Sequence, residues 1–272
     1  MQLSLSVRIA EAACKTRLNI PLRTLLNLAV EHGYEAVCMR ASAGGVQMPR
    51  ADLESVQRIL EDFQLPVSMV TADFDVPLNN ADGPNSLRDI GPSLDLAELF
   101  GCDLVRICLK TTADIEHARR AADAAGERGI RLAHQCHTTT LFEQVDRSLE
   151  VIDKIGATNF GIIYEPANLM LCGESYGVDT LQKLAPFLMN VYVQNHQLDE
   201  QGPVELDTWC LGIRRFHHIP LWEAGGVDYV KMAAGLTAIQ YTGYVTVHQH
   251  YAHIMEPARA AEESAQYLRS LG

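Results

Sequence analysis

The chain has 272 residues, of which 47% are apolar and 21% charged, values that are ordinary for a globular protein with a large core. Its formal net charge of −12 argues against binding to nucleic-acid backbones, which requires a basic face, but leaves room for a small anionic substrate. The apolar runs are much shorter than a membrane span needs, and the opening stretch MQLSLSVRIAEAACK lacks a secretory-signal pattern. The seven cysteines have no regular spacing, which is typical of reduced thiols, so we expect a cytoplasmic protein with no membrane partner.

Short apolar, β-branched runs alternate with amphipathic helical stretches along the whole chain. The first run, 3–9, precedes a predicted helix over 21–33, in which Pro21 suits the first turn and Gly33 suits the end. The other predicted strands, in chain order, are 35–40, 66–73, 103–110, 130–137, 160–169, 190–197 and 244–250. The other predicted helices are 51–63, 86–101, 114–129, 141–156, 178–188, 227–240 and 256–271.

Eight strand–helix units in this order predict a single α/β domain over 1–272, a (β/α)8 TIM barrel, whose usual length is about 250 residues. An open, doubly wound sheet is the alternative. The only long connection is 198–226, after the seventh strand, and we interpret it as a candidate active-site loop.

Polar side chains stand at the ends of the predicted strands, where barrel enzymes carry their catalytic and ligand-binding groups. A single histidine or glutamine at such a position is more commonly a hydrogen-bonded rim residue than a ligand. Glu165 is harder to interpret in this way, because a buried carboxylate directly after an apolar strand needs a cation or a donor. The strand-end residues are Arg40, Lys110, His134, His137, Glu165, Gln194, His196, His248 and His250.

Four of these side chains come from successive strands and are expected to converge on one metal ion. They are His134, Glu165, Gln194 and His248, whose imidazole, carboxylate and amide groups can all bind a divalent metal such as Mn²⁺, Co²⁺, Fe²⁺ or Zn²⁺. Such a site leaves positions open for a substrate. A hydrogen-bonded polar network without metal is the alternative.

Three stretches of the chain resemble the xylose isomerase-like TIM-barrel superfamily of sugar isomerases and epimerases, which includes ketose 3-epimerases and inosose dehydratase. They are GIRLAHQCH with the following helix to 156, NFGIIYEPANLML at 159–171, and the segment 225–251. In the last of these, Gly243 and Val247 fit the family's eighth strand, and His248 stands where a glutamate is usual.

The resemblance implies a divalent metal (Mn, Co, Fe, Zn or Mg) at the four positions named above, and proton transfer through an enediolate. The usual carboxylate bases are histidines here, so an unligated group must move the proton. Candidates for this catalytic role are His250, Lys110 and His137, while Arg40, Asn168 and His196 are candidates for substrate binding.

We therefore expect a metal-dependent isomerase or epimerase acting on a small keto-sugar or hydroxy-keto acid, with a homo-oligomer as the candidate assembly. A lyase using the same enolate chemistry and a non-catalytic metabolite-binding barrel are the alternatives. DNA repair like that of endonuclease IV is disfavoured, because it needs a basic face and more histidine and aspartate ligands.

Overall fold

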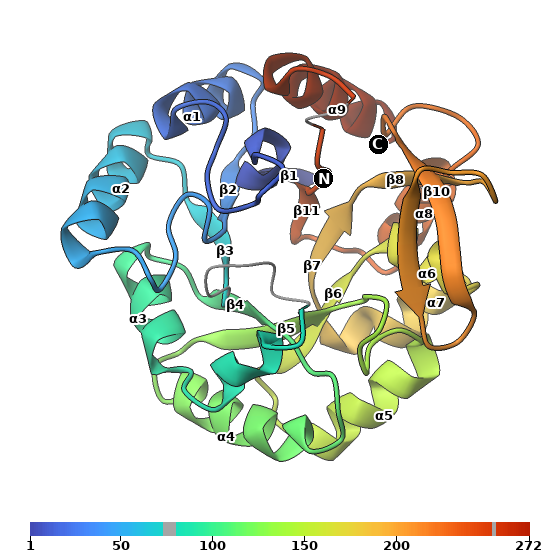
Figure 1. The fold of residues 1–272 in the computed structure, drawn as a ribbon, viewed down its shortest axis with the longest axis horizontal. Coiled ribbons are helices and arrows are strands. Elements are labelled where there is room, and N and C mark those ends of the chain that lie inside the picture. The colour runs from blue at the N-terminus through green and yellow to red at the C-terminus, as the bar shows by residue number, and fades with distance from the viewer. Residues whose placement is uncertain (73–79, 252–253) are drawn as a thin grey trace.

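The computed structural model describes residues 1–72, 80–251 and 254–272, and in them eight parallel strands close into a barrel (Figure 1). The order around the barrel is β1-β11-β7-β6-β5-β4-β3-β2, so the last strand closes on the first. The predicted (β/α)8 barrel is confirmed. The strands are β1 Gln2–Ser6, β2 Ala36–Met39, β3 Val67–Thr71, β4 Leu104–Ile107, β5 Arg131–Gln135, β6 Phe160–Tyr164, β7 Leu188–Val193 and β11 Tyr244–Val247.

Helices surround the barrel and cover its outer face (Figure 1). They are α1 Leu22–Glu31, α2 Arg50–Phe63, α3 Gly91–Leu99, α4 Asp114–Gly126, α5 Val145–Ile155, α6 Pro166–Leu171, α7 Val178–Leu184, α8 Tyr229–Ala238 and α9 Pro257–Ser270. Short 3-10 turns are η1 Val7–Ala10, η2 Gly83–Leu87 and η3 Ala185–Phe187. Pro21 directly precedes α1, and Gly33 follows it with a φ of 70°, which glycine adopts without strain. Within the described ranges, no helix is both long and apolar enough to cross a membrane.

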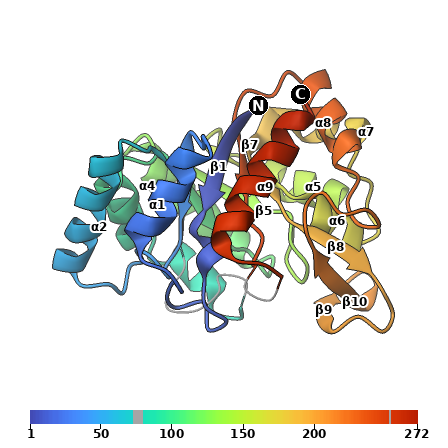
Figure 2. The same ribbon diagram turned by 90° about the horizontal axis from the view of Figure 1, so that it is seen from above.

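The seventh predicted strand is divided in two. β7 ends at Val193, and the chain then leaves the barrel as β8 Asn195–Leu198. The predicted loop 198–226 contains β9 Val204–Thr208 and β10 Gly212–Ile219, which form an antiparallel sheet with β8 in the order β8-β10-β9. Figure 2 shows this sheet projecting beyond one end of the barrel. Residue 73, the end of the third predicted strand, lies outside the described residues.

Polar side chains pair with one another inside the barrel. Ser4 and Ser68 hydroxyls are 2.7 Å apart. The Thr246 hydroxyl donates to the Asn190 side-chain oxygen at 2.9 Å. Buried polar groups need hydrogen-bond partners, and in these pairs each side chain supplies the partner of the other, so polar residues can occupy the barrel core. They also identify the inward-facing positions of β1, β3, β7 and β11, since side chains alternate between the two faces of a strand.

Candidate functional site

A cavity of about 410 Å³ opens at the end of the barrel where the strands terminate. The inner side of the added sheet closes part of it, through Val204, Leu206, Phe216 and His218. Five of the residues singled out from the sequence line this cavity: Arg40, His137, Asn168, Gln194 and His196.

Glu165 lies beneath the cavity, fully buried, and three side-chain amides donate to its carboxylate. Asn168 donates at 2.9 Å, and Gln135 and Gln194 make short hydrogen bonds to the two carboxylate oxygens. Burial is the dominant effect and raises the pKa of Glu165 to about 7. The hydrogen bond from Gln194 and the charge of Arg8 act in the opposite direction but are smaller. The donor that the sequence required for Glu165 is therefore supplied by amides.

The structure does not bring His134 to this group. Its ring stacks on Phe142 with centroids 4.1 Å apart and an interplanar angle of 9°. His134 pairs with Ile107 and Ile162 in the neighbouring strands, whereas inward-facing Arg106 pairs with Ala133. His134 therefore faces the helices, and the next residue, Gln135, contacts Glu165.

His248 faces inward but contacts an arginine. Its Nε2 lies 3.1 Å from Arg8 Nη1, and its Nδ1 lies 3.0 Å from Ser6 Oγ. Since arginine can only donate, Nε2 accepts, and the ring proton is on Nδ1. The ring also stacks on Tyr192 at 3.8 Å. Burial, followed by the charges of Arg8 and Arg40, lowers the pKa of His248 well below its ordinary value, so the ring is neutral.

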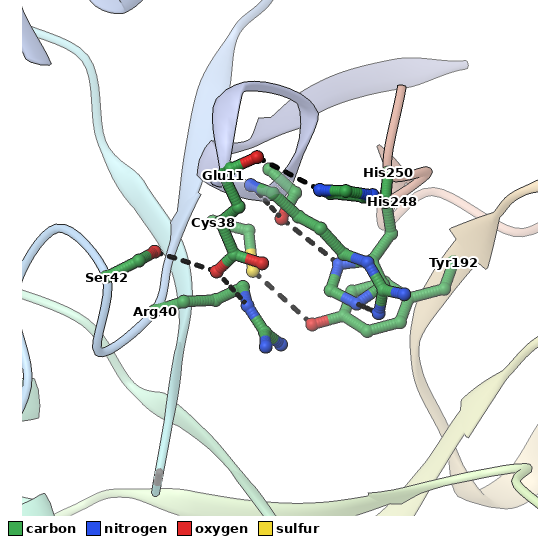
Figure 3. A network of polar contacts seen from close by, with 9 residues as sticks. Glu11, Cys38, Arg40, Ser42, Tyr192, His248 and His250 are labelled. Atoms are coloured by element: carbon green, nitrogen blue, oxygen red, sulfur yellow. Dashed lines mark hydrogen bonds and ion pairs between the residues drawn. The ribbon is translucent and has the colours of Figure 1, made fainter. Parts of the chain in front are cut away.

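Two candidate catalytic residues lie outside the cavity lining. His250 donates from Nε2 to the Glu11 carbonyl oxygen at 2.9 Å (Figure 3). Lys110 donates from Nζ to the Thr139 carbonyl oxygen at 3.1 Å, at the rim. The geometry therefore gives them less access to a bound substrate than His137 has.

Arg40 is neutralised within the protein. Its Nε donates to Glu11 at 2.7 Å, and Ser42 donates to the same carboxylate oxygen at 2.7 Å (Figure 3). Burial alone would raise the pKa of Glu11, but the charges of Arg40 and Arg8 hold it below its ordinary value. Both side chains of this ion pair are almost fully buried.

His137 and His196 share a tautomer that suits proton transfer. His137 Nδ1 donates to the Thr138 carbonyl oxygen, and His196 Nδ1 to the Asn195 carbonyl oxygen, each at 2.9 Å. A carbonyl oxygen only accepts, so each ring carries its proton on Nδ1 and its lone pair on Nε2. Burial lowers the pKa of both imidazoles, with a further contribution from His218 for His196, so both are neutral near pH 7.

The sequence reasoning missed three residues of this site: Arg8, Arg106 and Gln135. Arg106 lies in the middle of an apolar run and Arg8 in a turn after β1, so neither stands at a predicted strand end. Period-two alternation could have found two of them. Counting back in steps of two from the strand-end residue Lys110 selects Arg106, and the same alternation in β5 separates Gln135 from His134.

The donor set does not fit the expected metal ion. His134 faces away, the lone pair of His248 is used by Arg8, and both oxygens of Glu165 accept from amides. Two arginines lie beside the one carboxylate, which is unfavourable for a divalent cation. Among the residues that the structure describes, the buried side-chain oxygens of Gln135 and Gln194 have no hydrogen-bond partner, but neutral amide oxygens alone are weak ligands.

A different cluster brings potential ligand atoms together. Across the described part of the chain, Glu143, Cys172 and Cys210 are the residues whose carboxylate and thiol groups lie within 4.8 Å of one another. The Glu143 carboxylate accepts from the backbone N–H groups of Thr139, Trp209 and Cys210. These bonds attach the turn between β9 and β10 to the loop that follows β5, so the cluster has a structural explanation.

The family model for xylose isomerase-like TIM barrels matches residues 26–271. The chain belongs to this family. No curated protein matches its sequence.

Solved structures share the fold at low identity. The probable 3-DHS dehydratase AsbF of Bacillus anthracis superposes with a TM-score of 0.75 at 16% identity, over 99% of both chains. D-allulose 3-epimerase of Methylomonas sp., solved in complex with D-allulose, gives 0.71 at 12% identity over 100% of this chain and 97% of that one. A family member from Mycobacterium smegmatis, in complex with magnesium, gives 0.71 at 17% over 99% and 96%. At these identities the likeness establishes the fold alone.

Proposed function

We propose that the chain is an isomerase that moves a proton between neighbouring carbons of a small hydroxyketone through an enediolate. The observation that supports this is the cavity itself, which combines two neutral imidazoles, His137 and His196, with the cationic side chains of Arg8 and Arg106. The solved structures with this fold include a D-allulose 3-epimerase and a probable 3-DHS dehydratase, and we extend an activity of this kind to this chain as part of the proposal.

The chemistry needs one base for carbon and one proton carrier for oxygen. His137 Nε2 takes the proton from the carbon beside the carbonyl, the electron pair forms the enediolate double bond, and the former carbonyl oxygen gains charge. His137 then returns the proton to the neighbouring carbon. His196 Nε2 transfers the hydroxyl proton from one oxygen to the other. The arginines stabilise the negative charge of the intermediate.

No step of this mechanism uses a divalent metal, because His134, Glu165, Gln194 and His248 do not form a donor set that suits one. The earlier expectations of a homo-oligomer and a cytoplasmic location stay predictions. A lyase is the second candidate, because proton removal by His137 is also the first step of an elimination.

The test is proton exchange in D₂O with 2-keto-D-gluconate, followed by ¹H NMR. We expect loss of the signal of the proton beside the ketone, with appearance of an isomeric keto acid and no release of water. The variant His137→Gln is expected to lose this exchange, whereas His117→Gln, on α4 and outside the cavity, is expected to keep it. Stoichiometric loss of water would favour the lyase, and no exchange with either 2-keto-D-gluconate or the neutral ketose D-fructose would contradict both.

A further inference from the structure

Two cavity arginines have no carboxylate partner among the described residues. Arg106, on β4, is 2% exposed, and its Nε has no hydrogen-bond partner there. Its guanidinium carbon lies 5.8 Å from the centre of the Tyr192 ring. Arg8, in η1, also has an unpartnered buried Nε, and its Nη1 contacts the neutral ring of His248. Burial and the nearby charge of Arg40 lower the pKa of Arg8 to about 10, so it remains a cation at pH 7.

Among the described residues, the carboxylates whose charges act on Arg8 are already engaged. Glu11 binds Arg40 and Ser42, and Glu165 accepts from three amides. Lys15 and Asp207, the other charged groups that line the cavity, are on exposed stretches at its rim. The charges of Glu11 and Glu165 act on Arg8, and that of Glu165 on Arg106, but neither arginine forms an ion pair with a carboxylate of the described residues, and a buried cation that lacks a directly bonded partner costs several kcal/mol. Since Arg8 and Arg106 both line the cavity, an anionic ligand in the cavity can reach both.

We propose that Arg8 and Arg106 bind the carboxylate of a small acidic hydroxyketone, at the place where the sequence predicted a divalent cation. This inference rests on the proposed function, which makes the cavity the active site. It adds the substrate class, which is keto acids of the size of a sugar. The two guanidinium groups supply fixed positive charge and N–H donors, and a planar carboxylate matches this donor geometry.

A carboxylate fits better than a phosphate ester. TIM barrels that bind phosphate commonly use the loops after strands 7 and 8 together with a helix N-terminus. Here the chain after β7 enters the β8–β9–β10 sheet. The next helix, α8, is capped by its own Asp228, whose side chain accepts from Lys231 N, and neither residue lines the cavity. The described residues therefore provide two arginines but no such phosphate cradle.

The test measures binding of three matched ligands by isothermal titration calorimetry, with the full-length protein, excess EDTA and constant ionic strength. The ligands are 2-keto-D-gluconate, D-fructose and D-fructose 1-phosphate, which differ at C1 by a carboxylate, a hydroxymethyl and a phosphate ester. We expect 2-keto-D-gluconate to bind at least about ten-fold more tightly than D-fructose, because hydrogen bonds to a charged group are stronger than those to a neutral hydroxyl. We also expect it to bind at least about ten-fold more tightly than D-fructose 1-phosphate, because the described residues provide no phosphate cradle.

Substitution of each arginine tests whether Arg8 and Arg106 are the residues that bind the carboxylate. Arg106→Gln and Arg8→Gln are each expected to weaken 2-keto-D-gluconate binding about 10- to 100-fold and to leave D-fructose binding nearly unchanged. Arg131→Gln is the matched control, because Arg131 begins β5 at the opposite end of the barrel and pairs there with Asp103 at 2.9 Å. Circular dichroism checks folding, and the less buried Arg8 provides the second variant in case Arg106→Gln does not fold.

Several results would overturn the proposal. They are equal binding of D-fructose, tighter binding of D-fructose 1-phosphate, no binding of 2-keto-D-gluconate, or normal binding in both arginine variants. The proposed function fails differently. Tight, arginine-dependent binding of 2-keto-D-gluconate without proton exchange would contradict the isomerase and leave the carboxylate site standing. Proton exchange on neutral ketoses, without preferential binding of 2-keto-D-gluconate, would support the isomerase and contradict the carboxylate site.

Discussion

Gln135 and His134 are neighbours in β5, yet their side chains lie on opposite sides of the barrel wall. Gln135 donates to Glu165 beneath the cavity, whereas His134 stacks on Phe142 under the helices. One position in a strand thus separates a site residue from a core residue. The two residues can be tested against each other.

We expect His134→Phe to leave ligand binding within about two-fold of wild type, because His134 is not among the described residues that line the cavity. The variant is expected to lose about 1–3 kcal/mol of stability, because phenylalanine is larger than histidine at a fully buried position and removes the hydrogen bond from Nδ1 to the Gln135 carbonyl oxygen. Gln135→Leu is expected to weaken 2-keto-D-gluconate binding, because Glu165 loses a donor and moves. Calorimetry and urea unfolding of both variants check this. Loss of binding in His134→Phe alone would return His134 to the site.

The sequence was sufficient for the barrel but not for the details of its mouth. The alternation of apolar runs and helical stretches is a strong, repeated signal, and the barrel that it predicts is the observed one. Which residues of a strand face inward depends on the register of the strand. In a strand of only five residues, such as β5, the sequence does not fix the register to better than one position, and a shift of one position exchanges inward-facing and outward-facing residues. Arg106 was missed for a related reason, since a single arginine in an apolar run shows its direction only once its neighbours across the sheet are known.

The second prediction concerns Glu165 and its amide donors. Glu165→Ala removes the acceptor of three buried donors and the negative charge near Arg8 and Arg106. We expect the free energy of unfolding to fall by about 3–5 kcal/mol, which is the usual cost of removing one partner of a buried charged interaction and leaving the other partner in place. Glu165→Gln keeps one acceptor oxygen and is expected to cost about 1–3 kcal/mol. Urea unfolding at pH 8 measures both, and Glu150→Ala on the exposed side of α5 is the control.

Removal of divalent metal is the third test. Dialysis against EDTA is expected to leave 2-keto-D-gluconate binding and proton exchange within about two-fold of the untreated protein, because arginines supply the positive charge. Elemental analysis of the purified protein measures the metal content directly. A gain of ten-fold or more on adding Mn²⁺ or Mg²⁺ would mean that the amide oxygens of Gln135 and Gln194 turn toward an ion.

The fourth prediction concerns the attachment of the β8–β9–β10 sheet. The Glu143 carboxylate accepts from the backbone of Trp209 and Cys210 in the β9–β10 turn, and from Thr139 in the loop beside His137. Glu143→Ala leaves these N–H groups without their acceptor, so we expect faster amide hydrogen exchange at Trp209 and Cys210 and weaker ligand binding. Glu205→Ala, an exposed change within the same sheet, should leave the exchange at this turn unaltered. Unchanged protection in Glu143→Ala would show that the sheet is held by its apolar contacts instead.

The last prediction is a pH dependence of stability that arises from Glu11 and Arg40. The folded protein holds the pKa of Glu11 below its ordinary value, so the unfolded chain binds the proton more tightly. The stabilisation is therefore complete above the unfolded pKa, about 4.3, and is lost as the pH falls through the lower folded pKa. The variant Glu11→Gln lacks this pH-dependent stabilisation. It also leaves Arg40 without its buried carboxylate partner, which costs about 3–5 kcal/mol at neutral pH. We expect the difference in unfolding free energy between wild type and Glu11→Gln to be constant from pH 6 to 8 and to shrink below about pH 4. Urea unfolding across this range measures it, and a difference that stays constant down to pH 3 would contradict the assignment.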